Sequence, residues 1–425
     1  MFRFLHAADI HLDSPLRGLE RYPDAPVENV RSAPRRAFEN LVGLAIEEEV
    51  AFVLLAGDLY DGDWKDYNTG LFFVAQMRRL EAAGIPVHLV SGNHDAASQI
   101  TRRLRIPSNV KHYPHDRPQT TEIPELDVAI HGQSFAGRSV SDDLSAAYPQ
   151  AEADRFEIGL LHTSLDGRPG HADYAPCTVD GLRAKGYDYW ALGHVHQREV
   201  IGPDPWIVFP GNIQGRHARE AGPKGCSLVR VEHGEVAAVE QRDLDVVRWS
   251  RVEVDLSRAD SAEESVDRVQ NALGEARGAA DGRLLASRIV LCGRSGAHDA
   301  LARDPERWIH EFREQASALG APGVWIEKVV FDTRRPIDLG VELEREDALG
   351  DLMRMVAALD DGPLELASPL EEIAGHFADL KKKLPARLLS GEDAFDPTRP
   401  ETLRARLPAV RDLLLARLLD VEERA

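Results

Sequence analysis

Short apolar runs that end in polar residues alternate with helical patterns over the first 245 residues. Such runs are typical of buried strands. The runs are FRFLHAAD, VAFVLLAGD, IPVHLVSGNHD, FEIGLLHTS and YDYWALGHVH. PRRAFENLVGLAIEEE and GLFFVAQMRRLEAAG lie between the first three runs and have helical spacing, and Gly84 is the predicted C-cap of the second helix. This alternation predicts an α/β fold with a parallel sheet and covering helices.

The pattern changes after His196. WIVFPGN and GCSLVRVEHGEVAAVEQRDL are typical of antiparallel strands, with EHGE as a hairpin turn. Near residue 246 the order strand, helix, strand, helix, strand restarts, which predicts a small α/β domain. From Pro336 onward there is no strand pattern, and three segments have apolar residues at helical spacing. We therefore expect three regions, 1–245, 246–335 and 336–425.

Composition narrows the class of protein. With 425 residues and 43% hydrophobic residues, the chain can bury more than one core. The N-terminus has no signal-peptide pattern, and no apolar run reaches the ~20 residues that span a bilayer. Cys177, Cys226 and Cys292 are far apart and odd in number, which favours a reducing cytoplasm over a disulfide framework. A net charge of −20 gives no global attraction to nucleic acid, so any such function needs local basic surface or metal ions.

Polar residues gather where the predicted strands end. In open α/β sheets, ligands bind beyond the carboxyl ends of the strands, so we expect these side chains to meet at one place. Each motif alone also fits an ordinary turn or strand end, but the ordered set favours a site. The residues in question are Asp9, His11, Asp58, Asn93, His94, Asp95, His162, His194 and His196.

These side chains have the chemistry of a metal centre. Oxygen and imidazole donors without thiolate suit Mn²⁺, Fe or Zn²⁺. Their number is too large for one metal with an open position and suits two metals that share one carboxylate. Two such metals clamp the attacking and leaving oxygens of a phosphoryl centre. The glycines before Asp58, Asn93 and His194 fit tight turns where the backbone approaches the site.

The ordered set D-x-H, G-D, G-N-H-D, H and G-H-x-H resembles the calcineurin-like metallophosphoesterase superfamily over residues 1 to about 245. HAADIHLDSPL, LLAGDLYD, VSGNHD, ALGHVHQ and FPGNIQGRH are similar to its DNA-repair exonuclease branch, the SbcD/YhaO-like proteins. The resemblance implies a core of β-sheets flanked by helices, then a small α/β capping domain and a C-terminal helical, partner-binding region. For the last two regions the similarity is one of layout.

The resemblance also implies roles for the site residues. Asp9, His11, Asp58 and His196 would hold one metal, and Asp58, Asn93, His162 and His194 would hold the other. His94 would protonate the leaving oxygen or stabilise the phosphorane, and Asp95 would orient His94. Some relatives have a histidine three residues after the Gly-Asp aspartate. Here that position is Asp61, so no second catalytic histidine is assigned.

Several basic residues are candidates for substrate contacts. Arg216 and His217 in GNIQGRHARE would touch the scissile phosphate or the next one, unless this stretch is a solvated loop. The run TRRLRI, which contains Arg102, Arg103 and Arg105, fits either a contact to the DNA backbone or a solvated helix face.

Together these features indicate a Mn²⁺-dependent phosphodiesterase that hydrolyses DNA, of the exonuclease type, by a water that two metals activate. One alternative is a metallophosphoesterase for a small nucleotide or a phosphomonoester. Another is a non-catalytic scaffold for a DNA-bound ATPase. The resemblance implies DNA and a coiled-coil, SMC-like ATPase as partners, leaves a homodimer open and implies no membrane. In the tail, Val410, Leu413, Leu414, Leu418 and Val421 form an apolar stripe that fits either docking of a partner helix or packing on the tail's own helices.

Overall fold

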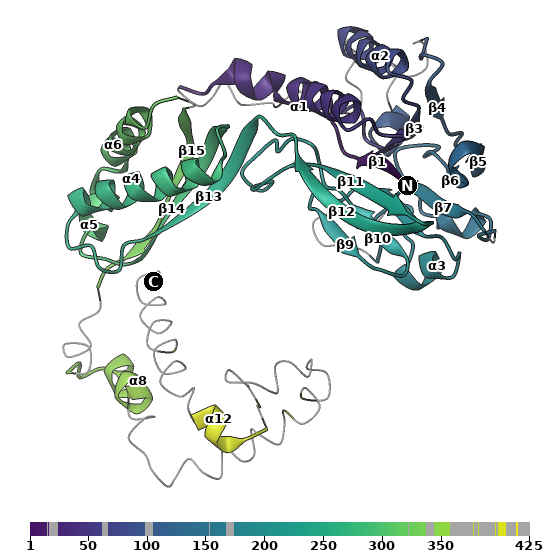
Figure 1. Ribbon diagram of the computed structural model, residues 1–425. Coiled ribbons are helices and arrows are strands. Elements are labelled where there is room, and N and C mark those ends of the chain that lie inside the picture. Colours follow the sequence, from purple (N-terminus) through teal and green to yellow (C-terminus); the bar gives the residue numbers. More distant parts are fainter. Residues whose placement is uncertain are drawn as a thin grey trace. The chain divides into compact units, whose positions relative to one another are not determined.

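The structure is a computed structural model of the full chain (Figure 1). The residues that it describes are 1–14, 16, 24–61, 67–97, 105–152, 154–166, 174–321, 323–336, 344–357, 377, 381, 396, 398–404 and 414. The chain divides into two compact units, Met1–Arg334 and Arg335–Ala425, which are described separately.

The first sheet of the larger unit contains the predicted βαβαβ segment. Its strand order is β12 (Glu235–Asp243), β11 (Gly225–Glu232), β1 (Phe2–Ala7), β2 (Phe52–Ala56), β3 (Val87–Val90) and β4 (Val110–His112). Strands β1 to β4 are parallel, and β11 and β12 add antiparallel strands joined by the predicted hairpin. The connecting helices are α1 (Val27–Glu47) and α2 (Tyr67–Ala82). Gly84, with φ +72°, ends α2 as predicted, because Ile85 N–H then reaches the Leu80 carbonyl at 2.9 Å.

A second six-stranded sheet holds the later strands. Its order is β5 (Gln119–Ile123), β6 (Val128–Gly132), β7 (Phe156–His162), β8 (Tyr189–Gly193), β10 (Trp206–Phe209) and β9 (Glu199–Ile201). Here one prediction is wrong: β10, expected to be antiparallel, runs parallel to β8 and is antiparallel only to the edge strand β9. The apolar run Trp206–Phe209 lies between β8 and β9, so a strand flanks it on each side and helps to bury it. An edge strand would have only one such neighbour.

The two sheets pack face to face, and helices cover the outer face of the first sheet. Phe4, Phe52, Ile158 and Tyr189 belong to the core between the sheets. A second core, which includes Phe38 of α1, joins the first sheet to its helices. The fold is therefore a sandwich of β-sheets flanked by helices. Because of this packing, strands of both sheets can end at the same site.

The predicted second strand and helix alternation is also confirmed. Strands β13 (Val247–Asp255), β14 (Leu284–Arg294) and β15 (Val324–Arg334) form a parallel sheet. Helices α4 (Ala262–Ala279), α5 (His298–Arg303) and α6 (Pro305–Ala318) pack on it. Trp249 and Trp325 of this sheet pack against Val30 and Ala33 of α1, so both regions belong to one compact unit. A domain boundary at residues 245/246 stays a prediction.

The smaller unit is described only in part. Helix α8 (Ala348–Ala357) confirms the first expected helix of the tail, and Asp347 caps it by accepting a 2.8 Å hydrogen bond from Gly350 N–H. A short helix, α12, covers Pro400–Arg404. Of the predicted apolar stripe, Val410, Leu413, Leu418 and Val421 lie outside the described residues. None of the described helices is both long and apolar enough to cross a bilayer.

Candidate metal centre

The loops that follow β1 and β2 lie side by side and adopt an unusual backbone conformation. Asp9 N–H donates to the Gly57 carbonyl at 3.1 Å, and His11 N–H donates to the Asp58 carbonyl at 3.0 Å. Asp9, His11 and Asp58 have φ values of 51°, 47° and 53°, and His194 after β8 has a φ of 106°. Non-glycine residues with such positive φ angles cost about 1–3 kcal/mol each, and they concentrate at functional sites.

The glycines next to these residues are required by close packing, as the sequence predicted. A Cβ on Gly57 would lie 2.5 Å from His162 Nδ1, and one on Gly92 would lie 2.3 Å from Asp58 Oδ1. A Cβ on Gly193 would lie 1.8 Å from the Ala56 carbonyl oxygen. Any side chain at these positions would therefore push the candidate ligands apart.

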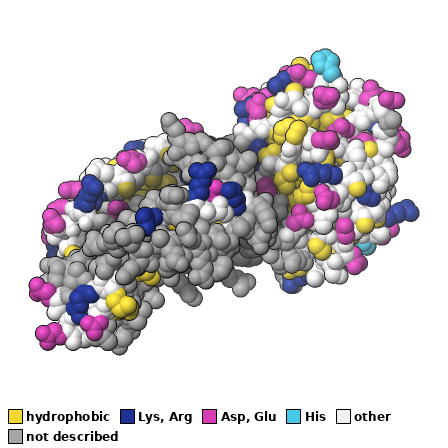
Figure 2. Space-filling model, turned by 90° about the horizontal axis from the view of Figure 1, so that it is seen from below, with side chains coloured by type: hydrophobic (Ala, Val, Ile, Leu, Met, Phe, Trp, Pro, Cys, Tyr) yellow, Lys and Arg dark blue, Asp and Glu magenta, His cyan; other side chains and the backbone are white. Residues whose placement is uncertain are grey.

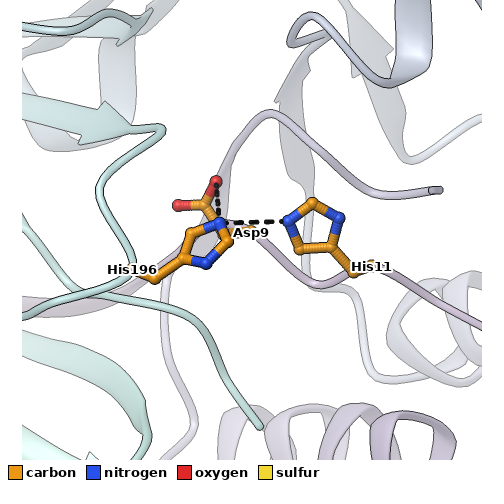
Figure 3. Close-up of side chains that lie close together, drawn as sticks. All are labelled: Asp9, His11 and His196. Atoms are coloured by element: carbon orange, nitrogen blue, oxygen red, sulfur yellow. Dashed lines mark hydrogen bonds and ion pairs between the residues drawn. The ribbon is translucent and has the colours of Figure 1, made fainter. Parts of the chain in front are cut away.

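Asp9, His11 and His196 form the first group of candidate ligands (Figure 3). His196 Nδ1 donates to Glu220 Oε1 at 2.7 Å, so Nε2 presents a lone pair. That Nε2 lies 3.2 Å from His11 Nε2 and 3.8 Å from Asp9 Oδ1. Burial holds the pKa of His11 well below its usual range, which keeps this imidazole neutral. The neutral imidazole of His11, the imidazole of His196 and the Asp9 carboxyl group thus face one another, as ligands around a cation do.

Asp58, Asn93, His162 and His194 form the second group. His162 Nδ1 donates to the Ala56 carbonyl at 2.9 Å, so its Nε2 is an acceptor, and burial keeps the ring neutral by lowering its pKa. This Nε2 lies 3.1 Å from Asn93 Oδ1 and 3.6 Å from Asp58 Oδ2. This nitrogen and the two oxygens face one another, as ligands around a cation do. His194 completes the group: its ligand atom lies within 4.8 Å of those of Asp58 and His162.

The two groups fit two divalent cations. Burial, and then repulsion from the Asp58 charge, raises the pKa of Asp9 above its usual range. Burial, and then repulsion from the Asp95 charge, raises the pKa of Asp58 to about 7. Cations would offset these costs by stabilising both carboxylates. Asp58 also belongs to a further group with His11 and His94, so its carboxylate reaches toward both sets of ligands. This position is the one expected for a shared carboxylate.

The prediction that Asp95 orients His94 is wrong. The Asp95 carboxylate accepts backbone hydrogen bonds from Leu59, Tyr60 and Gly92 at 3.1, 2.9 and 3.1 Å, and so ties together the loops after β2 and β3. Its buried carboxylate points into these loops, and the neighbouring backbone N–H groups use both of its oxygens.

Asp61 holds His94 instead. Its Oδ1 lies 2.9 Å from His94 Nδ1, and Ser14 Oγ donates to Oδ2 at 2.6 Å. The hydrogen bond to Asp61 raises the pKa of the His94 imidazole. The signal in the sequence was the departure noted above, an aspartate three residues after Asp58.

Glu220 is a second residue whose role the sequence analysis missed. Its Oε1 accepts from His196 Nδ1, and its Oε2 accepts from Arg216 N–H at 2.8 Å and from Asn212 Nδ2 at 3.0 Å. Burial alone would raise the pKa of Glu220, but the hydrogen bond from His196 and the charge of Arg216 hold it below its usual range. Glu220 therefore fixes the tautomer of a candidate ligand, as carboxylates behind metal-binding histidines do.

The predicted substrate contacts differ in their distance from the centre. Arg216 Nη2 lies 3.3 Å from His196 Nδ1, which puts this guanidinium beside the candidate ligands. The side chain of His217 is 47% exposed, and its Nε2 lies 3.7 Å from Glu220 Oε1 at the rim. Arg105 is exposed, and Arg102 and Arg103 lie outside the described residues.

Comparisons with known proteins agree with this geometry. The calcineurin-like phosphoesterase family model matches residues 2–198, and a model of the middle domain of the metallophosphoesterase YhaO matches residues 249–334. The metallophosphoesterase YhaO of Bacillus subtilis is 33% identical over 380 residues, which cover 88% of this chain and 90% of that protein.

Proteins named DNA double-strand break repair protein Mre11 are more distant. The one from Haloferax volcanii is 28% identical over 65% of this chain and 58% of its own length. The one from Sulfurisphaera tokodaii is 25% identical over 57% of this chain and 63% of its own length. The sandwich fold and its cluster of Asp, Asn and His ligands define a metal-dependent phosphoesterase. The chain belongs to the calcineurin-like phosphoesterases, whose members use two divalent metals.

Proposed function

We propose that the protein is a Mn²⁺-dependent phosphodiesterase that hydrolyses DNA in the manner of an exonuclease and serves DNA repair. The observation that carries this proposal is the convergence of imidazole nitrogens with carboxylate and amide oxygens from two sheets. Imidazole and oxygen donors without thiolate suit Mn²⁺. The names of the Mre11 relatives support DNA as the substrate.

The candidate ligands would divide between two cations, and Asp58 would serve both. When bound, the cations lower the pKa of water and neutralise charge on the phosphoryl group. Glu220 holds Nδ1 of His196 and the Ala56 carbonyl holds Nδ1 of His162, so Nε2 of each ring is turned toward the cation that it would bind. In this proposal the ligands are Asp9, His11, Asp58 and His196 for one cation, and Asp58, Asn93, His162 and His194 for the other.

His94 is the proton donor in this proposal. Its side chain is 39% exposed, so it faces the space that a substrate would enter. Asp61 holds Nδ1 and favours the protonated ring, which leaves the Nε2 proton for the oxygen of the leaving group. That oxygen then departs as a hydroxyl group. Asp95 acts on His94 only indirectly, because it fixes the loop that carries it.

The test compares duplex DNA with p-nitrophenyl phosphate diesters and monoesters, each with and without Mn²⁺. We expect Mn²⁺-dependent degradation of DNA from its ends and hydrolysis of the diester. A His94→Ala protein, purified in parallel, is the control for contaminating nucleases. Hydrolysis of the monoester alone would favour the small-substrate alternative. Binding of DNA without hydrolysis of any ester would favour a scaffold.

We also propose that residues 336–425 bind a coiled-coil, SMC-like ATPase in the cytoplasm. The support is the layout shared with the SbcD/YhaO-like branch, the separate compact unit 335–425, and the exposed Leu352 and Met355 of α8. The three cysteines are free, which suits a reducing compartment. A chain that ends at residue 335 should no longer co-purify with the ATPase, although it remains a phosphodiesterase. Retention of the ATPase at full affinity would place the contact in residues 1–335.

A further inference from the structure

A pocket of about 410 Å³ opens directly beside the candidate metal centre. One wall is His196, a candidate ligand, with its neighbour Gln197, and the rest comes from the segment that follows β10. Arg216, His217, Arg219 and Lys224 of that segment line the pocket, which we call the 216–224 pocket. A group bound there would lie next to whatever binds at the metal centre.

The 216–224 pocket is basic in a chain whose net charge is −20. Arg216, Arg219 and Lys224 bring three cationic side chains, against one lining carboxylate, Glu220. Both Glu220 oxygens already accept hydrogen bonds from His196, Arg216 and Asn212, so this carboxylate is committed to the protein. On the face in Figure 2, by contrast, the coloured Lys and Arg side chains are interspersed with Asp and Glu.

The pocket also has unused hydrogen-bond donors. Lys224 is 5% exposed, and within the described part of the chain its ammonium makes one hydrogen bond, to the His196 carbonyl at 2.8 Å. The buried Nε of Arg216 has no hydrogen-bond partner there. Arg219 is exposed and has no ion pair or hydrogen bond with the described residues. Cationic donors left over after internal pairing are what an oxyanion such as phosphate would bind.

The location of the pocket relates it to the direction of the reaction. The imidazoles follow the order His94, His11, His196, with ring centroids 5.0 and 5.1 Å apart. In the proposed function His94 protonates the leaving oxygen, so the leaving fragment lies at the His94 end. The fragment that keeps the phosphoryl group then extends toward His196 and the 216–224 pocket.

We propose that the 216–224 pocket is a second phosphate subsite, which binds the backbone phosphate adjacent to the scissile one on the fragment that keeps the phosphoryl group. This inference rests on the proposed function and adds a substrate requirement to it. The preferred substrate carries at least one further phosphate, and a mononucleotide ester leaves the subsite empty. Arg219 and Lys224 thereby become specificity-determining residues that no motif in the sequence indicated.

The test measures binding by titration calorimetry in Mn²⁺. Thymidine 3′,5′-bisphosphate is compared with thymidine 5′-monophosphate and thymidine 3′-monophosphate. The bisphosphate offers a second phosphate in either strand polarity. The 5′-phosphorylated dinucleotide pTpT, whose second phosphate is an internal diester, distinguishes a subsite for the polymer backbone from one for a terminal phosphate.

We expect the bisphosphate and pTpT to bind about tenfold or more tightly than either monophosphate, because a charge-assisted contact is gained. Arg219→Ala and Lys224→Met should each bring this ratio toward one. Arg183→Ala, at an exposed arginine on α3 (Val179–Arg183), is the matched control and should keep the ratio.

Equal affinity for one and two phosphates in the unmodified protein would overturn the subsite, and so would a ratio that both variants retain. A gain for the bisphosphate alone would assign the subsite to a terminal phosphate and overturn its role in binding the polymer backbone. Because pTpT is a diester, its titrations and their monophosphate references use the His94→Ala background, in which it should not be hydrolysed. The binding result is then independent of the hydrolysis assay. Tight binding of the bisphosphate without hydrolysis of any ester would leave the subsite in place and remove the proposed function.

Discussion

The β-sandwich and the three-stranded region β13–β15 are built in similar ways, yet among the described residues only the sandwich holds a group of candidate metal ligands. Both contain parallel strands with covering helices and polar residues after the strands. In the sandwich, Asp9, Asp58 and His194 follow β1, β2 and β8 with positive φ. In β14 a positive φ near the end of the strand falls on a glycine, Gly293, which adopts it without strain.

The polar groups at these strand ends differ as well. In the three-stranded region they are paired: Ser295 Oγ donates to the Ala259 carbonyl at 2.8 Å, and His298 Nδ1 lies 3.0 Å from Thr333 Oγ1. In the sandwich, His162 Nε2 and Asn93 Oδ1 face each other as acceptors. The fold alone therefore does not indicate a site. Backbone strain and facing polar atoms at the strand ends distinguish the sandwich, with its candidate metal centre, from the described residues of the three-stranded region.

The largest expected effect comes from exchanging one carboxylate in each region. Asp58→Asn should lose bound metal and reduce diester hydrolysis by about 10³-fold or more, since a catalytic metal contributes several kcal/mol. Asp255→Asn, at the end of β13, should change neither metal content nor rate. Elemental analysis by mass spectrometry and a diester assay measure both quantities. Normal metal content in Asp58→Asn would show that this carboxylate is not shared between cations.

His94→Ala separates chemistry from metal binding within the sandwich. This variant should keep its metal content and lose about 10²–10⁴-fold in rate, the usual contribution of general acid–base catalysis. A variant that lost metal would make His94 a ligand, as its group with His11 and Asp58 would allow.

Smaller effects should come from the two carboxylates that orient imidazoles. Asp61→Asn should lower kcat by about 10–100-fold at unchanged metal affinity, because Asp61 touches His94 and no other candidate imidazole at hydrogen-bond distance. Glu220→Gln should weaken metal binding by a similar factor, because Glu220 acts on His196. Metal titrations followed by assays at saturating metal distinguish the two effects. The same phenotype in both variants would contradict this division of roles.

The sequence predicted the candidate ligands that the structure brings together, but not the residues that orient them. The candidate ligands follow apolar runs, and that pattern is visible in the sequence alone. Asp61 is 33 residues from His94 in the chain, and Glu220 is 24 residues from His196. These carboxylates gain their roles only when the folded chain brings their loops together. The carboxylate nearest to His94 in sequence, Asp95, bonds to backbone N–H groups instead, because the chain turns there. The parallel pairing of β10 depended likewise on a long-range partner, β8.

The smallest predicted effect concerns buried histidines of the sandwich that lie away from the metal centre. Burial lowers the pKa of His88 to about 4 in the folded chain, while the unfolded chain keeps the usual value of 6.5. Below pH 6.5 the unfolded state therefore gains a proton that the folded state does not, and stability falls as the pH decreases. His88 should contribute about 1 kcal/mol of this loss between pH 6.5 and 5.5.

Urea denaturation at these two pH values measures the effect. The His88→Gln variant should show a smaller pH dependence than the unmodified protein, whatever its absolute stability. An identical slope in both proteins would mean that His88 is protonated in the folded state.

The hydrogen bond from His162 to the Ala56 carbonyl shows how metal binding could affect the stability of the whole fold. It links β7 of one sheet to β2 of the other, and the candidate ligands likewise come from the ends of both sheets. Cations bound there would hold the two sheets together. When the free metal concentration is 100 times the dissociation constant, binding adds about 2.7 kcal/mol to the free energy of unfolding. The lifetime of this protein in a cell would then depend on the concentration of divalent metal. As that concentration fell, the lower stability would expose the protein to proteolysis before the loss of metal limited catalysis.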